Sequence, residues 1–284
     1  MLQELRKKAE ANDAEAQCGL GVIYAEGKAV PEDKSEAVKW FYKAAKQGHA
    51  KGQNYLGIMY AHGLGVSKDE GKASQWFQKA AEQGYTQAQF MLGQLYYYGR
   101  GLPQDYKKAA EWYHKAAEQG DAEAQFMLGM MHQNGLGVVK DEIQTAEWYR
   151  KAAEQGNAQA QFGLGFMHIH GNSVRQDYVK AEKWLRKSAE QGIANAQFFL
   201  GLMHIEGKGV SKDETQTVTW YQKSAEQGLA EAQFGLGMMH GAGRGTPKDE
   251  AKAEYWIKKA ADQGYNEAIV VYKKICAKKA TRFF

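Results

Sequence analysis

Hydrophobic and polar positions recur along this chain with a period of 36 residues. The seven tryptophans show the period most plainly, at Trp40, Trp76, Trp112, Trp148, Trp184, Trp220 and Trp256. A fixed period of roughly 20 to 50 residues is typical of a solenoid, in which each unit packs only on its neighbours. The 284-residue chain is therefore predicted to be a repeat array rather than two globular domains.

The period divides the chain into seven ungapped units between two flanking pieces. The units span residues 13–48, 49–84, 85–120, 121–156, 157–192, 193–228 and 229–264. Residues 1–12 resemble the end of a preceding unit and are expected to form an N-terminal cap. Residues 265–284 are expected to form a C-terminal capping helix with a basic tail.

Each unit is predicted to form two helices. In the fourth unit, the core face of the first helix is predicted to hold Gln125, Leu128, Gly129 and His132. A glycine that ends this helix in the left-handed conformation is expected in every unit, at Gly27, Gly63, Gly99, Gly135, Gly171, Gly207 and Gly243. An aspartate that caps the start of the second helix follows, at Asp33, Asp69, Asp105, Asp141, Asp177, Asp213 and Asp249.

Another glycine recurs in the middle of every first helix, at Gly21, Gly57, Gly93, Gly129, Gly165, Gly201 and Gly237. A mid-helix glycine costs about 1 kcal/mol relative to alanine. Its recurrence therefore predicts a site where the partner helix passes too closely for a Cβ atom. The second helices are expected on the convex side, with each Trp packed between neighbouring helices. Their Lys and Glu residues, such as Lys151 and Glu154, are interpreted as a solvated ion-pair face.

The composite pattern A-x-A-Q-x-x-L-G-x-x-Y/H-x-x-G-x-G-V-x-x-D-x-x-K-A-x-x-W-Y-x-K-A-A-E-Q-G resembles the Sel-one-like repeat family, a relative of the tetratricopeptide repeat. The resemblance covers residues 13–264, but the Cys pair that staples each repeat in some bacterial members is absent. It implies an all-α, right-handed α/α superhelical solenoid with a concave face. It also implies a non-enzymatic scaffold or adaptor that binds another protein, since bacterial members include host-interaction factors, envelope regulators and immunity proteins.

Charge and composition change this picture little. The formal net charge of +4 comes from 37 basic and 33 acidic residues that are mixed along every unit, so nucleic acid is not an expected partner. No run approaches the roughly 20 apolar residues of a membrane helix, and a membrane partner is not expected. The first residues lack the apolar segment of a signal peptide. Localisation is thus cytoplasmic as the sequence stands, or periplasmic if a leader has been removed.

Four histidines occupy one position of the repeat, at His132, His168, His204 and His240. The first three units have tyrosine there, so a packed ring that makes one hydrogen bond is favoured over a metal ligand. No Ser-x-x-Lys or His-Glu-x-x-His motif occurs in the sequence. The chain is accordingly predicted to have no catalytic residues, metal or cofactor. The alternative is an enzyme or small-ligand binder, for a β-lactam or a cell-wall fragment, that uses a polar pocket of the groove.

Three positions on the far side of the first helix vary among units and predict the binding surface. The first position holds Cys18, Asn54, Phe90, Phe126, Phe162, Phe198 and Phe234. The second holds Val22, Ile58, Gln94, Met130, Phe166, Leu202 and Met238. The third holds Ala25, Ala61, Tyr97, Gln133, Ile169, Ile205 and Gly241, and His170 ends the same helix as Ile169.

In a tetratricopeptide-like stack this side faces the concave groove. From the third unit onward it would be lined by aromatic residues and Met, as interaction surfaces often are. We therefore predict that a peptide, helix or loop of another protein binds there, with Phe166 at the centre between Met130 and Leu202. The alternative for the phenylalanine series, that it is half-buried between adjacent units, remains open at the level of sequence.

The last segment permits two interpretations. Ile269, Tyr272 and Cys276 can cap the last hydrophobic face while the lysines around them stay in water. The basic helix, with Phe283 and Phe284 after it, could instead touch an acidic partner or an anionic membrane. Capping is the favoured interpretation.

Overall fold

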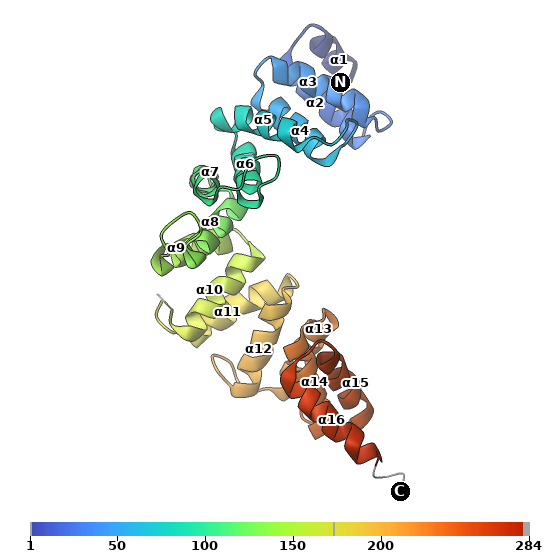
Figure 1. The fold of residues 1–284 in the computed structure, drawn as a ribbon, viewed down its shortest axis with the longest axis vertical. Helices are drawn as coiled ribbons and strands as arrows, with labels where there is room; N and C mark the ends of the chain where they lie inside the picture. The colour runs from blue at the N-terminus through green and yellow to red at the C-terminus, as the bar shows by residue number, and fades with distance from the viewer. Residues whose placement is uncertain (1, 173, 281–284) are drawn as a thin grey trace. The chain divides into compact units, whose positions relative to one another are not determined.

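The computed structural model describes residues 2–172 and 174–280, and within them the chain is entirely helical (Figure 1). The first half contains α1 (Leu2–Glu10), α2 (Ala14–Glu26), α3 (Lys34–Lys46), α4 (Ala50–His62), α5 (Glu70–Glu82), α6 (Thr86–Tyr98), α7 (Tyr106–Glu118) and α8 (Ala122–Asn134). The second half contains α9 (Glu142–Glu154), α10 (Ala158–His170), α11 (Tyr178–Glu190), α12 (Ala194–Glu206), α13 (Glu214–Glu226), α14 (Ala230–Ala242), α15 (Glu250–Asp262) and α16 (Asn266–Ala280).

The chain forms two compact units, residues 1–145 and 146–284, whose boundary falls in α9. Within each unit, consecutive helices pack side by side as a solenoid of helix pairs. The even-numbered helices from α2 to α14 are the first helices of the seven repeats, and the odd-numbered helices from α3 to α15 are the second. α1 and α16 are the flanking helices, while Phe283 and Phe284 lie outside the described residues.

The predicted start and stop residues are confirmed. The Asp33 carboxylate accepts the amide hydrogen of Glu36 at 2.9 Å, and the other six aspartates cap their helices in the same way. Accepting the amide hydrogen of Lys180 lowers the pKa of Asp177, which then stays ionised at the positive end of α11. The glycines after the first helices have φ between 66° and 74°, a range that disfavours any residue with a side chain.

The mid-helix glycine marks a close approach of the partner helix, as predicted. A Cβ on Gly21 would lie 2.6 Å from the ring of Phe41, and one on Gly201 would lie 2.6 Å from the ring of Tyr221. The nearest atoms belong to the side chain of the residue after each Trp, and in the seventh repeat the backbone carbonyl of Ala253 would also lie 3.0 Å from a Cβ on Gly237. In six of the repeats the structure describes this contact, with Leu185 and Ile257 in place of a ring in the fifth and seventh.

A pair of glutamines, one buried and one exposed, joins a repeat to the one before it. Gln197 is 4 % exposed, and its amide donates a hydrogen bond to the Ala189 carbonyl of the preceding second helix at 3.0 Å. Its own carbonyl accepts a hydrogen bond from Gln227, at the end of the second helix of the same repeat, at 2.8 Å. Five other repeats show the same pair. Burying an amide without partners is costly, so each pair holds three helices in one register.

The tryptophans pack between repeats, as predicted, but their lysine neighbours differ from prediction. Trp220 is 5 % exposed and packs on Ala189 of α11 and Leu200 of α12. The Lys three residues after each Trp lies over the indole ring, with Nζ of Lys151 4.0 Å from the ring centroid of Trp148. This is a cation–π contact, and it replaces the Lys–Glu ion pair inferred from spacing. Glu118 instead pairs with His114, at 3.4 Å.

The glycine contact predicts opposite effects for two alanine substitutions in α2. Gly21→Ala should lower the free energy of unfolding by about 1–3 kcal/mol, because the methyl group overlaps a ring that cannot move. Gly19→Ala should raise it by about 0.5–1 kcal/mol, because its methyl group would meet only Leu5, at 3.7 Å, and alanine favours the helix. Urea denaturation of both variants measures the difference. Equal effects would contradict the assignment of the ring as the limiting contact.

Candidate functional site

The predicted groove residues of the third to seventh repeats all keep some exposed surface. They are Phe90, Gln94, Tyr97, Phe126, Met130 and Gln133 in the first unit, and Phe162, Phe166, Ile169, His170, Phe198, Leu202, Ile205, Phe234 and Met238 in the second. None of them is buried, whereas Cys18 and Asn54, the counterparts in the first two repeats, are 1 % and 0 % exposed. At the first of the three positions, burial therefore changes at the third repeat, while Val22, Ile58, Ala25 and Ala61 at the other two positions are half-exposed as in the later repeats.

In the first unit, aromatic and Met side chains on α6 and α8 lie together. The Tyr97 hydroxyl lies 3.8 Å from the sulfur of Met130, which joins the third repeat to the fourth. The Tyr97 ring meets that of Tyr106 edge-on at 5.2 Å, and burial raises the pKa of the Tyr97 hydroxyl. Phe90 packs on Tyr113 at 5.7 Å. These side chains form a half-exposed surface whose hydroxyl stays protonated at neutral pH.

In the second unit, Phe166 lies at the centre of an aromatic patch on α10 and α12, formed by Phe162, Phe166, His170 and Phe199. The ring of Phe166 meets Phe199 edge-on at 5.4 Å and lies 4.1 Å from the His170 ring. Phe162 is 6.0 Å from Phe199, which bridges the fifth and sixth repeats. His170 Nδ1 is 2.9 Å from the Phe166 carbonyl, and this contact fixes its ring beside Phe166.

Phe199 was missed by the sequence prediction although it holds the patch together. Its position of the repeat carries Gly19, Tyr55, Met91, Met127, Gly163, Phe199 and Gly235. This variation from glycine to phenylalanine was the available signal. In the fifth and seventh repeats the residue is glycine, and a Cβ there would lie 2.8 Å from the ring of Tyr149 or Tyr221 of the preceding repeat. In the sixth repeat no such ring intrudes, because the preceding repeat has Leu185 instead.

The phenylalanine series is half-buried, because each ring packs on neighbouring side chains and keeps some exposed surface. The Phe198 ring stacks on Tyr221 of the same repeat at 5.5 Å, and Phe234 packs on Tyr265 at 5.5 Å. Leu202 and Ile205 are also half-buried against the core of the sixth repeat. Met238, on α14, is more exposed than Phe234 on the same helix, with 45 % of its surface accessible.

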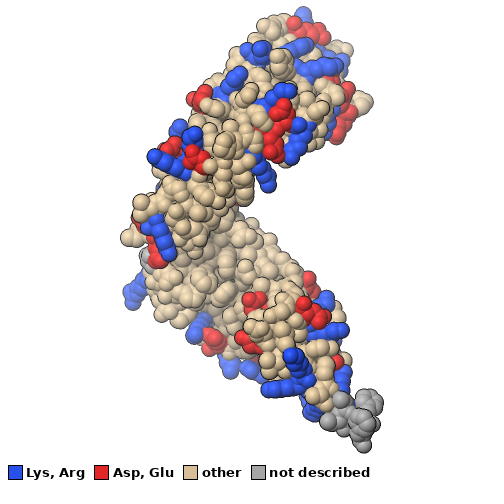
Figure 2. Space-filling view, in the orientation of Figure 1, with Lys and Arg blue, Asp and Glu red and all other residues tan. Residues whose placement is uncertain are grey.

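Charge is distributed unevenly between the two helices of a repeat. The first helices of the third to seventh repeats contain no Lys or Arg, and their acidic residues are Glu123, Glu206 and Glu231. Figure 2 shows an uncharged stretch of surface over α10 and α12. The lysines belong to the second helices and the loops. An apolar partner can therefore approach the aromatic patch without displacing the hydration of a nearby cation.

The four histidines divide into two pairs with different surroundings. Nδ1 of His132 lies 3.3 Å from the Val139 carbonyl, and Nδ1 of His168 lies 3.3 Å from the Arg175 carbonyl, as the packed-ring prediction requires. His204 and His240 are 7 % and 6 % exposed, and their Nδ1 atoms have no hydrogen-bond partner in the described part of the chain. The prediction of one hydrogen bond for each ring is thus wrong for His204, whose Nε2 also lacks a partner in the described part of the chain. Burial, with Lys252 nearby, lowers the pKa of His240.

Other chemically reactive groups are sparse among the residues that the structure describes. Over residues 2–172 and 174–280, no three His, Cys, Asp or Glu side chains are grouped as metal ligands would be. Both cysteines are free, and burial raises the pKa of Cys18 to about 11, so its thiolate is scarce at neutral pH. Within the same residues, every helix is too short or too polar to cross a bilayer.

Comparison with known proteins agrees with the repeat geometry. A family model described as Sel1 repeat matches residues 14–49, 50–85, 86–121, 122–157, 158–193, 194–229 and 230–265. The chain belongs to the Sel1 repeat family. Members of this family generally act as non-catalytic scaffolds for protein interactions.

Two solved Sel1 repeat structures are similar along nearly the whole chain. One is c5321, a protective antigen of uropathogenic Escherichia coli, with 38 % identity, a TM-score of 0.89, and coverage of 96 % of this chain. The present chain spans 58 % of the length of c5321. The other is a Sel1 repeat protein of Oxalobacter formigenes, with 39 % identity, a TM-score of 0.74, and coverage of 96 % of this chain and 79 % of that one. A search of curated proteins gave no significant match.

The buried histidine of the seventh Sel1 repeat predicts a dependence of stability on pH. Because the folded pKa of His240 lies below its ordinary value of about 6.5, the unfolded chain takes up the proton first. The stability that this residue contributes is complete above that ordinary value and is lost as the pH falls toward the folded pKa. His240→Gln should therefore reduce the fall in thermal midpoint between pH 7 and pH 5. Parallel curves for the two proteins would contradict this.

Proposed function

We propose that this Sel1 repeat protein is a scaffold that binds an apolar peptide, helix or loop of a partner protein on the first helices of its second unit. The binding surface consists of the aromatic patch on α10 and α12, extended by Leu202, Ile205 and Met238. The observation that carries the proposal is the half-exposed cluster of rings around Phe166 on helices without Lys or Arg.

The energetics of interfaces favour this surface over the second-helix side. Binding energy usually concentrates in a few aromatic anchors that become fully buried in the complex. Phe166 already has neighbours on two sides, so its ring is held in place and loses little conformational entropy on binding. The Lys–Trp pairs of the second helices offer exposed charges, which contribute little to affinity. The corresponding face of α6 and α8, with Tyr97 and Met130, offers a separate surface of similar chemistry.

The test compares a change in the patch with a change on the second helix of the same repeat. Phe166→Ser should weaken binding of a native partner by at least about 2 kcal/mol, a typical hot-spot loss. Its cost to folding should be roughly 1 kcal/mol, because the ring is only half-buried. Wild-type and variant proteins serve as baits in extracts of the native source, and mass spectrometry identifies partners depleted from the Phe166→Ser sample. The affinity of each such partner is then measured by calorimetry.

The matched control is Lys183→Ala, an exposed position of α11. Lys151 is unsuitable for this purpose, because its ammonium group packs on Trp148 and its removal would disturb the core. Partners should bind Lys183→Ala as tightly as wild type. Equal affinity of wild type and Phe166→Ser, or a greater loss of affinity in Lys183→Ala, would show that the partner does not bind on the first helices.

A further inference from the structure

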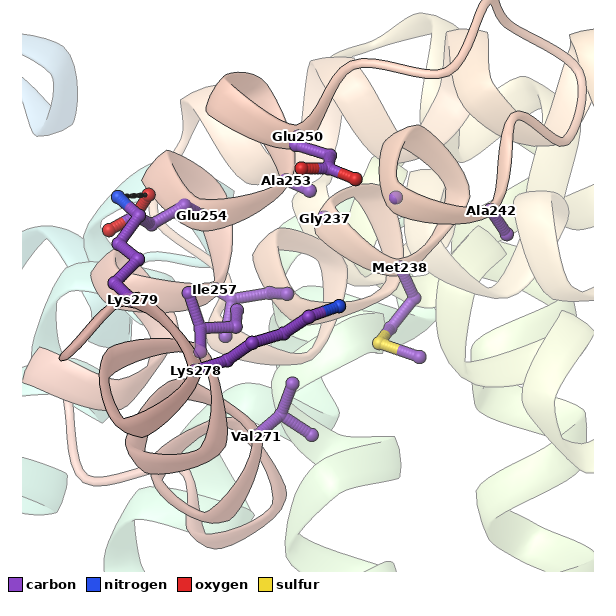
Figure 3. Close-up of a pocket in the computed structure, with 12 residues that line it drawn as sticks. Gly237, Met238, Ala242, Glu250, Ala253, Glu254, Ile257, Val271, Lys278 and Lys279 are labelled. Carbon is purple, nitrogen blue, oxygen red and sulfur yellow. Dashed lines mark hydrogen bonds and ion pairs between the residues drawn. The ribbon is translucent and has the colours of Figure 1, made fainter. Parts of the chain in front are cut away.

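A pocket lies between α14, α15 and α16, the last three helices of the chain that the structure describes. Its volume is about 430 Å³, and its walls include Met238 and Gly241 of α14, Ala253 and Ile257 of α15, and Val271 of α16 (Figure 3). This volume lies within the range of sites that hold a small ligand or a large side chain. All the helices that form it belong to the second unit.

The equivalent space in the fifth repeat is filled by the protein's own side chains. There Phe166 of α10 meets Phe199 of α12 at 5.4 Å, and Ile169 packs on the same core. The seventh repeat has Met238 for Phe166, Gly241 for Ile169 and Val271 for Phe199. Two further replacements, Ala242 for His170 and Glu250 for Tyr178, remove a ring each. The pocket is therefore the volume that rings and a branched side chain occupy two repeats earlier.

The helix that closes the pocket is basic. α16 carries Lys273, Lys274, Lys278 and Lys279 against a single acidic residue, Glu267. Lys279 forms an ion pair with Glu254 at one edge, as Figure 3 shows. In the same view the Lys278 side chain runs past Ile257 and Val271 toward Met238. Glu250 and Glu254 also line the pocket, but α16 as a whole carries four lysines and one glutamate, which favours a ligand that combines an apolar group with negative charge.

We propose that this pocket binds one aromatic side chain of an acidic peptide segment, with the lysines of α16 facing the acidic residues on either side of the ring. The proposal rests on the proposed scaffold function and adds a second anchor with its own partner chemistry. The aromatic ring supplies most of the affinity, because it fills a cavity that the fold fills with rings elsewhere. The lysines supply orientation and a dependence on salt, because they lie in water.

The probe is a displayed library of random twelve-residue peptides, selected on the full-length protein. Enriched peptides should share one Phe, Tyr or Trp within three residues of at least two acidic residues. Synthetic versions are then titrated by fluorescence anisotropy. Replacing the aromatic residue by Ala should weaken binding at least about tenfold. Raising the salt concentration from 50 to 300 mM should weaken binding of the same peptide as the charges become screened.

Filling the pocket from either wall should abolish this binding. Gly241→Ile introduces the residue found at this position in the fifth and sixth repeats, and its first added carbon would meet only the Ala253 methyl, at 3.4 Å. Val271→Phe fills the pocket from the opposite wall with the residue that the sixth repeat has at this position. It replaces Gly241→Ile in the test if that variant does not fold. Ala61→Ile is the matched control, because it introduces the same residue at the same position of the second repeat. Circular dichroism and the thermal midpoint verify folding.

The outcomes separate this site from the aromatic patch. A loss of at least about tenfold in the filled variants, with Ala61→Ile and Phe166→Ser within about twofold of wild type, supports the pocket. Peptides that lose affinity for Phe166→Ser but not for Gly241→Ile bind the aromatic patch. That result contradicts the proposed peptide site in the pocket but is consistent with the proposed scaffold function. Enrichment of basic or non-aromatic peptides, or of none, also contradicts the proposed peptide site. So does a dimer in sedimentation that Gly241→Ile dissociates, because a second copy would then be the occupant.

Discussion

The contact between a side chain of each second helix and a glycine of the first helix is the constraint on which the rest of the structure depends. Where Phe41 lies against Gly21, or Tyr221 against Gly201, the two helices can approach closely while a large buried side chain fills the space between them. That approach sets the position of the neighbouring Trp and of the alanines around it. Because the six repeats in which this contact is described meet the same constraint, the residues that serve it are similar and carry no information about a partner.

The glutamine pairs extend this local geometry from one repeat to the next. A buried amide with two partners at fixed positions tolerates little displacement, so Gln197 determines where α12 lies relative to both α11 and the end of α13. Polar groups in the core thus give register, and apolar groups give stability. The remaining face of each first helix contacts these recurring positions only in part and keeps some exposed surface from the third repeat onward. It is on that face that the repeats differ from one another.

Much of the fold could be predicted from sequence because helix ends are decided locally. The Asp caps and the left-handed glycines act within a few residues, so spacing alone located nearly every helix. Side-chain partners between helices could not be predicted in this way. The periodicity placed Lys151 near Glu154, but the Trp148 ring proved to be the closer neighbour. It placed Gly21 against the partner helix, as observed, without identifying the Phe41 ring as the contact. Phe199 escaped notice for the same reason, since its role depends on which ring the preceding repeat lacks.

Variation on a constant frame explains how one fold can present several surfaces. In a solenoid each repeat touches only its neighbours, so a change at one position alters the local surface and leaves distant repeats intact. The third repeat fills the space beside its first helix with Tyr97 and Tyr106, and the fifth fills it with Phe166 and Phe199. The seventh leaves it open, because Gly241 and Val271 are too small. Equivalent positions of the repeat therefore form an aromatic patch in the fifth repeat and a pocket in the seventh. The size of the side chains at these positions determines which of the two is formed.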